Sequence, residues 1–141
     1  MEVFIASDKD GLALKDYLVE ELKGYDFNLV DVSPDNGTFV ESVEELVSHL
    51  QNNENALAIA IDAYGAGSFI AATKHKNIVA AEVSDERSAY MTREHNNSRM
   101  ITMGSQIVGK ELAKNIALYF LRAKYDGGRH QIRVDMLNKM C

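Results

Sequence analysis

A glycine turn between two apolar segments is the first feature of this sequence that could take part in chemistry. Residues 56–61 are apolar and uncharged, as expected of a strand that is buried on both faces. The residues after Gly67 favour a helix, with Ser68 as its predicted N-cap and Lys74 near its end. Gly65 and Gly67 allow a sharp turn that points backbone N–H groups and the positive end of a helix dipole at one place. Such a place can hold an anion or an oxyanion formed in a reaction, although a tight turn can also need glycine for its shape alone.

Polar side chains follow two of the predicted strands. Asp8 and Lys9 come after the strand expected at 2–7, and Asp62 comes after the strand at 56–61. The carboxyl ends of parallel strands share one edge of a sheet, and ligands bind beyond that edge. We therefore predict that Asp8, Lys9 and Asp62 lie near the glycine turn, with an ordinary polar loop as the alternative for Asp8 and Lys9.

His95 lies near the predicted C-terminus of a helix. The helix dipole favours a positively charged imidazole there, which suits a proton donor or a group that handles a sugar ring oxygen. The alternative is an ordinary surface histidine. Asn96 or Asn97 beside it is an equally good candidate for the C-cap of that helix.

A pair of arginines near the C-terminus has the spacing of a phosphate site. Arg129 follows Gly127-Gly128 directly, and Arg133 lies four residues further on. Residues four apart share one face of a helix, so the two guanidinium groups can converge on one phosphate. Two solvated arginines on a terminal helix are the alternative, and the preceding glycines favour the phosphate.

The bulk composition is that of a soluble globular protein. The chain has 141 residues, 46% hydrophobic and 26% charged, which predicts one domain over residues 1–141. Its one cysteine is residue 141, so no internal disulfide can form, and neither a signal peptide nor a membrane span is expected. These features fit a cytoplasmic protein without a membrane partner, and the net charge of −6 argues against nucleic-acid binding.

The charge is divided unevenly along the chain. Residues 1–70 carry 14 Asp and Glu against 3 Lys, a net −11, whereas residues 71–141 carry 7 Asp and Glu against 12 Lys and Arg, a net +5. All the arginines lie in the second half, so we expect anion-binding side chains to come from there.

Strand and helix patterns alternate along the chain. Strands are expected at 2–7, 26–32, 56–61, 78–83 and 99–104, and helices at 12–22, 40–50, 68–76, 84–97, 107–121 and 129–139. This alternation predicts a Rossmann-like, doubly wound parallel sheet of five strands, with helices on both faces and a C-terminal helix.

Together these motifs resemble the ribose-5-phosphate isomerase B and galactose-6-phosphate isomerase family. The likeness is carried by four segments along nearly the whole chain: Ser7–Gly11, Gly65–Gly67, Arg93–Asn96 and Tyr125–Arg133. It implies conversion of a phosphorylated aldose to a ketose, such as galactose 6-phosphate to tagatose 6-phosphate, with no metal and no cofactor. A base removes the proton from C2, a cis-enediol(ate) forms, and the proton returns at C1.

The resemblance also implies roles for the candidate residues. His95 would assist ring opening and Asn96 would bind the enediolate. Gly65 and Gly67 would shape the loop whose N–H groups steady that anion, and Arg129 and Arg133 would hold the phosphate. The family's site lies between two subunits, so these residues need not meet within one chain.

Three positions depart from the family pattern at the loop. The catalytic cysteine, the glycine after it and the nearby threonine are replaced by Asp62, Ala63 and Tyr64. Near the start of the chain, Lys9 stands where the family often has histidine. The favoured hypothesis is a hetero-oligomer that acts on a phosphorylated hexose, in which a related, cysteine-containing subunit supplies the base. The alternative is a self-sufficient enzyme in which Asp62 is the base, since carboxylates can remove protons next to carbonyls.

The sequence leaves two alternative functions of other classes, a nucleotide-binding module and a silent assembly subunit. A nucleotide-binding module would use the glycine turn and Glu82, but Ile70 occupies the third glycine position of the fingerprint and the turn follows the third strand rather than the first. A catalytically silent assembly subunit would have no need of His95, Arg129 and Arg133.

Overall fold

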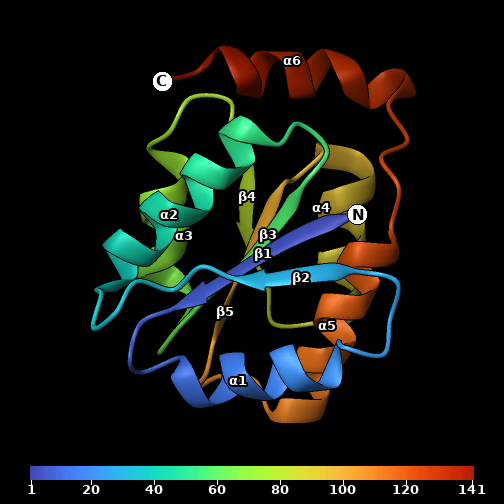
Figure 1. The fold of residues 1–141 in the computed structure, drawn as a ribbon. Coiled ribbons are helices and arrows are strands. Elements are labelled where there is room, and N and C mark those ends of the chain that lie inside the picture. The colour runs from blue at the N-terminus through green and yellow to red at the C-terminus, as the bar shows by residue number, and fades with distance from the viewer.

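The computed structural model describes all residues from Met1 to Cys141, and Figure 1 shows a central sheet with helices on both faces. The strands are β1 (Glu2–Ser7), β2 (Asn28–Asp31), β3 (Leu57–Asp62), β4 (Ala80–Glu82) and β5 (Met100–Gly104). The helices are α1 (Leu12–Glu21), α2 (Phe39–Asn52), α3 (Ala66–Thr73), α4 (Glu86–Asn96), α5 (Lys110–Arg122), a short 3-10 turn η1 (Gly128–His130) and α6 (Gln131–Lys139).

The five strands are parallel, in the order β2-β1-β3-β5-β4. The predicted fold class is therefore confirmed. The first strand has its predicted bounds, and every other expected strand and helix is present with shifted ends. The connection through α3 passes over β5, so that the short strand β4 becomes one edge of the sheet.

Strand β3 lies at the centre of the sheet, and all of its residues are buried. Successive side chains on a strand point to opposite faces. Leu57, Ile59 and Ile61 belong to the core that α1, α4 and α5 cover, whereas Ala58 and Ala60 belong to the core under α2 and α3. In Figure 1 these two layers lie on opposite sides of the strands.

Helix α2 shows how the sequence fixes an element locally. The hydroxyl of Thr38 accepts a hydrogen bond from the Glu41 backbone N–H, and the Glu41 carboxylate accepts one from the Thr38 N–H, which completes a capping box. Its buried side chains recur on one face of the helix, as the sequence pattern predicts: Ser42, Val43, Leu46, Val47 and Leu50.

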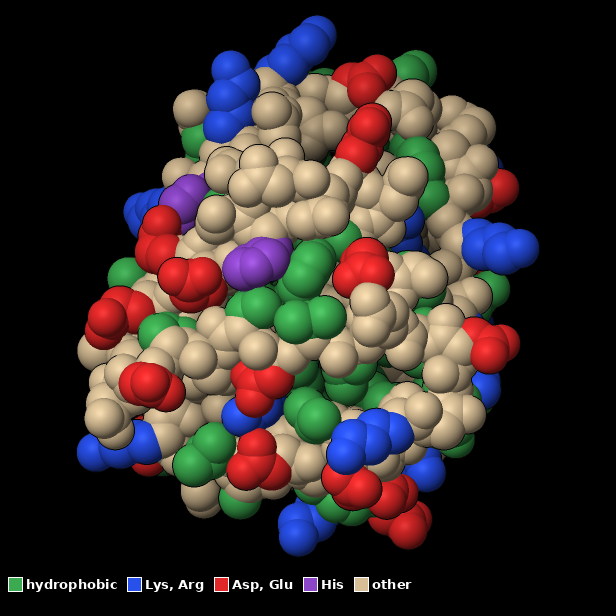
Figure 2. Space-filling model, in the orientation of Figure 1, with side chains coloured by type: hydrophobic (Ala, Val, Ile, Leu, Met, Phe, Trp, Pro, Cys, Tyr) green, Lys and Arg blue, Asp and Glu red, His purple; other side chains and the backbone are tan.

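Helix α6 lies apart from the two covering layers, across the top of Figure 1, near the end at which the strands begin. Val134 is its only buried residue, and Ile132, Met136 and Met140 on and just after this helix are largely exposed. Figure 2 shows acidic and basic side chains intermixed over this face of the molecule, with basic ones projecting at the top. None of the helices combines the length and the apolar character that crossing a membrane requires.

Candidate functional site

The predicted site residues form two groups at opposite ends of the sheet. Asp8, Lys9 and the glycine loop follow the carboxyl ends of β1 and β3. Helix α4 begins beyond the carboxyl end of β4 and must return to the amino end of β5, so its last residues, His95 and Asn96, lie at the amino edge. Helix α5 makes the same return, which brings the segment with Arg129 and Arg133 to the amino edge as well. We call these groups the loop group and the histidine group.

In the loop group, the side chain of Asp62 turns back onto the loop that follows it. One carboxylate oxygen accepts a hydrogen bond from the backbone N–H of Gly65 at 2.5 Å, and the other accepts one from the N–H of Ser68 at 3.1 Å. Asp62 is only 5% exposed. The carboxylate therefore serves as the anion at the start of α3, where the unpaired N–H groups and the helix dipole favour negative charge.

This arrangement corrects the predicted cap of α3. The helix begins at Ala66 with Gly65 as the N-cap residue, and the buried hydroxyl of Ser68 lies inside the first turn without a hydrogen-bond partner. The sequence pattern misplaced the cap because the side chain that satisfies the N–H groups comes from Asp62 at the end of the strand, before the turn rather than within it.

Strand β5 and the residues after it hold the glycine loop from one side. The Thr102 hydroxyl donates to the Gly65 carbonyl at 2.7 Å, and the Ser105 N–H donates to the Asp62 carbonyl at 2.8 Å. Gly65 has φ +76°, in the left-handed region, and lies against the backbone of Met103 and Gly104. The loop is therefore fixed by contacts within the chain, whereas the side chain of Tyr64 is 64% exposed.

Asp8 and Lys9 lie next to this loop at the same edge. The Gly11 N–H donates to the Asp8 carboxylate at 3.0 Å, and the Ser105 hydroxyl donates to the Asp10 carbonyl at 2.8 Å. Burial raises the pKa of Asp8 above its ordinary value, and the negative charges of Asp10 and Asp62 act in the same direction, against the hydrogen bond from Gly11. Asp8 is half-buried, and Lys9 is exposed.

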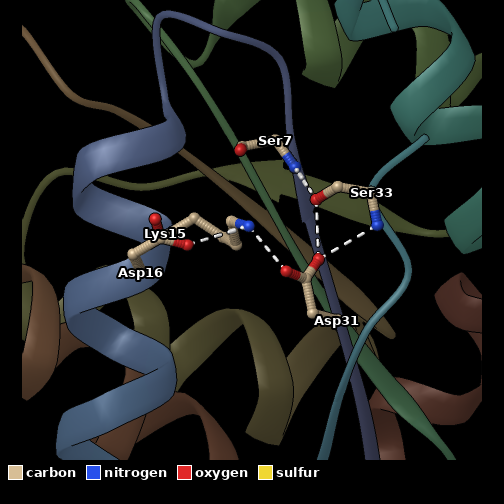
Figure 3. Close-up of polar contacts among 5 residues, drawn as sticks. All are labelled: Ser7, Lys15, Asp16, Asp31 and Ser33. Carbon is tan, nitrogen blue, oxygen red and sulfur yellow. Dashed lines mark hydrogen bonds and ion pairs between the residues drawn. The ribbon is translucent and has the colours of Figure 1, made fainter. Parts of the chain in front are cut away.

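A buried lysine supports the strand end that leads into Asp8, as Figure 3 shows. Lys15 on α1 donates to Asp31 at the end of β2 and also contacts Asp16 at 3.0 Å. Asp31 in turn accepts from the hydroxyl of Ser33, and that hydroxyl accepts from the backbone N–H of Ser7. The network thus joins α1, β2 and the last residue of β1, and so fixes where the Asp8 loop begins.

Burial alone would lower the pKa of Lys15 and raise that of Asp31. The hydrogen bonds and opposite charges within the network outweigh burial for both groups. The pKa of Lys15 is consequently raised, and that of Asp31 is lowered below its ordinary 3.8.

In the histidine group, the ring of His95 stacks on the ring of His130 from η1, with centroids 4.2 Å apart and planes 15° from parallel. The Asp126 N–H donates to the Glu94 carbonyl at 3.0 Å, which ties the segment after α5 to the end of α4. Arg129 and Arg133 are exposed and are close enough to act on the charge of His130. The structure thus brings His95 and the two predicted phosphate ligands together.

His130 is the residue of this group that the sequence did not single out. Desolvation lowers its pKa, and the positive charges of His95, Arg129 and Arg133 lower it further. Its position directly after Arg129 was the available signal, but its contact with His95 depends on how the chain folds back after α5.

Asn96 and Asn97 have different places at the end of α4. Asn97 is the C-cap residue, with φ +54°, and its side chain accepts a hydrogen bond from Arg93 at 2.7 Å. The Asn96 side chain is exposed, and its oxygen accepts from the Thr92 hydroxyl at 3.2 Å. The amide nitrogen of Asn96 can therefore serve as a donor toward a ligand.

A cleft of about 790 Å³ runs along the outer side of β4, the edge strand. Ala66 and Glu82 line it near the carboxyl edge, and Asn96, Leu137 and Met140 line it near the amino edge. No cluster of three or more His, Cys, Asp or Glu side chains has the arrangement needed to hold a metal ion.

The chain was compared with known proteins. The family model described as Ribose/Galactose Isomerase matches residues 3–137. The galactose-6-phosphate isomerase subunit LacA of Streptococcus pneumoniae (strain P1031) is 60% identical over 141 residues, covering 100% of both chains. The protein of the same name from Staphylococcus haemolyticus is 61% identical over 142 residues, again with complete coverage of both.

Solved structures of the same fold give a consistent result. The ribose-5-phosphate isomerase B of Mycoplasma genitalium, with bound ribulose 5-phosphate, is 34% identical with a TM-score of 0.92, covering 98% of this chain and 94% of that one. The ribose-5-phosphate isomerase B of Clostridium thermocellum is 30% identical with a TM-score of 0.92, covering 99% and 96%.

Proposed function

The chain belongs to the ribose/galactose isomerase family, and from this membership we propose that it is a subunit of a galactose-6-phosphate isomerase. The reaction is the conversion of galactose 6-phosphate to tagatose 6-phosphate. Relatives about 60% identical over their whole length carry the name of that enzyme's subunit, which supports this substrate over a pentose phosphate. The same proposal places the protein in the cytoplasm, where phosphorylated sugars are retained because the charged phosphate does not cross a membrane.

The observation that carries this proposal is the separation of the loop group from the histidine group. Within one chain the two groups lie at opposite edges of the sheet, so a substrate cannot contact both. When two related chains pack with the loop edge of one against the histidine edge of the other, the groups come together. A shared site of this kind requires a partner, and the relatives named as subunits support one.

We propose further that the partner is a related subunit that supplies a cysteine as the base. Cys141 is the only cysteine of this chain, and its Sγ lies 3.4 Å from the carbonyl of Thr73, at the far end of α3 from the glycine loop. It therefore cannot replace a thiol at position 62. Asp62 is a poor substitute, because both of its oxygens already accept backbone hydrogen bonds and the side chain is buried.

In this proposal the histidine group of this chain binds and prepares the substrate. Arg129 and Arg133 hold the phosphate through charge-assisted hydrogen bonds. His95, stacked on His130, donates a proton to the ring oxygen of the cyclic sugar as the bond from C1 to that oxygen breaks. The C1 hydroxyl gives up its proton to water in the same step, and the open-chain aldehyde forms.

The partner's thiolate then removes the C2 proton, and the electron pair of that C–H bond forms the C1–C2 double bond of the enediolate. The amide of Asn96 donates to the enediolate oxygen, which carries the developing negative charge. Proton transfer between the two oxygens and return of the proton to C1 give the ketose. In the productive site the partner contributes the loop that corresponds to Asp8, Lys9, Gly65 and Gly67 of this chain.

The test is an isomerase assay with galactose 6-phosphate, on this chain alone and co-expressed with a cysteine-containing paralogue. We expect activity only in the mixture. The variant His95→Ala in the mixture should lower kcat/KM by about 10²-fold or more, the usual contribution of a general acid.

The matched control is His49→Ala, since His49 lies on α2 and packs against Phe4, away from both groups. Its activity should stay within about twofold of the unmodified mixture, because changes away from the site act mainly on stability. Full turnover by this chain alone, lost in Asp62→Asn, would show that the shared-site proposal is wrong.

A further inference from the structure

We infer that Asp62 is a built-in anion that fills the anion-binding position of its own glycine loop, so that this loop accepts no substrate. The inference rests on the proposed function in one respect: it predicts how many working sites a pair of related subunits holds. Two packed chains could in principle form two shared sites, one at each loop. Here only the loop of the partner would be open to substrate.

The hydrogen bonds of Asp62 carry the inference. Strand, glycine turn and helix start together present backbone N–H groups to an anion. In this chain the N–H groups of Gly65 and Ser68 already donate to the two oxygens of the Asp62 carboxylate. The carboxylate is held below the surface at 5% exposure, so it is part of the folded loop rather than a mobile side chain.

An incoming enediolate would meet two obstacles at this loop. The donors that would steady it are occupied, and the fixed negative charge of Asp62 repels a second anion. Asp8 adds to this repulsion, since its charge and that of Asp62 are close enough to affect each other. Thr102 and Ser105 also hold the backbone of the loop, through hydrogen bonds to the Gly65 and Asp62 carbonyls.

Tyr64 adds bulk to the same loop, because its phenol ring is 64% exposed. The contacts that carry the inference are those of Asp62.

The first experiment counts binding sites in the unmodified enzyme. Isothermal titration of the assembled pair with a six-carbon aldonic acid 6-phosphate, an anionic analogue of the enediolate, should give one binding site for each copy of this chain paired with its partner. Two equivalent sites for each pair would overturn the inference, while the isomerase activity and the proposed function would still stand.

The second experiment tests the built-in anion directly. The variant Asp62→Ala in the full chain should lower the melting temperature by about 5–10 °C, because two buried N–H groups lose their acceptor. Sodium formate supplies a free carboxylate of the size removed. It should restore part of the lost melting temperature, beyond any effect of sodium chloride at equal ionic strength.

The matched control is Asp85→Ala. Asp85 also caps a helix, accepting from the Ser88 N–H at the start of α4, but it is exposed to water. Water satisfies the freed N–H group there, so formate should not restore the melting temperature of this variant. A formate response no larger in Asp62→Ala than in Asp85→Ala would overturn the built-in anion. If Asp62→Ala does not fold at all, the count of binding sites decides the question alone.

Discussion

At the scale of single residues, the chain contains charged side chains of two kinds. His95, Arg129 and Arg133 lie at the surface of the amino edge, around His130, whose own pKa is lowered. Asp62 and Lys15 are buried, and their charged groups form hydrogen bonds with partners within the chain. Burial therefore separates the surface charges of the proposed substrate site from the charges that hold the chain's own loops.

The Lys15–Asp31 pair gives the residue-scale prediction. Because the pKa of Asp31 is lowered in the folded protein, its stabilisation is fully present above its ordinary pKa of 3.8 and is lost as the pH falls through the folded value. We expect Asp31→Asn to lower the free energy of unfolding by about 1–2 kcal/mol near pH 7, a value reduced for the partial exposure of the carboxylate. The difference from the unmodified protein should shrink as the pH falls below about 4.

Urea unfolding at a series of pH values measures this difference. Asp35→Asn, an exposed aspartate in the turn after β2, is the control and should follow the unmodified protein at every pH. A difference for Asp31→Asn that stays constant down to pH 2 would contradict an ion pair as the cause.

At the scale of elements, the turn from β3 into α3 depends on a glycine in the left-handed region. Gly65 has φ +76°, and a Cβ there would lie 3.0 Å from the Met103 carbonyl carbon and 3.1 Å from the Gly104 nitrogen. We expect Gly65→Ala to lower the free energy of unfolding by about 2–3 kcal/mol, from left-handed strain together with crowding of backbone that cannot easily move.

The control for this prediction is Gly24→Ala, at a position where an added Cβ meets nothing within 4 Å. Its unfolding in urea should match that of the unmodified protein within about 0.5 kcal/mol. Equal stability of the two alanine variants would mean that the turn tolerates another conformation.

The same turn shows how far the sequence predicts this molecule. The strand at 56–61 and the helix after the turn follow from apolar patterning, and the structure has both. The cap was predicted wrongly at Ser68, because the position of the Asp62 side chain depends on the positive φ of Gly65, which residue types alone do not determine. The contact of His95 with His130 could likewise not be predicted from the sequence, because it depends on where the segment after α5 packs.

At the scale of the whole molecule, the parallel sheet itself separates the two groups. Every crossover helix returns the chain to the amino edge, so residues that follow strands and residues that end helices lie at opposite edges. The loop group comes from the acidic half of the chain, residues 1–70 with a net −11, and the histidine group from residues 71–141 with a net +5. A related subunit with the same distribution of charge would be attracted when its loop edge packs on the histidine edge of this chain.

This arrangement predicts how activity depends on composition and concentration. If each working site combines one loop edge with one histidine edge, activity at fixed total protein should peak when this chain and the proposed cysteine-containing partner are mixed in equal amounts. Specific activity should then fall on dilution below the dissociation constant of the pair. Raising the salt to about 0.5 M should shift that fall to higher protein concentration, because screening weakens attraction between the acidic half of one chain and the basic half of the other. Steady-state assays over a series of mixing ratios and dilutions, with sedimentation velocity to follow the complex, measure both effects. Activity that rises in simple proportion to one chain, with no dependence on the other, would contradict this prediction. It would mean that copies of that one chain associate with each other and bring a loop group and a histidine group together without the second chain.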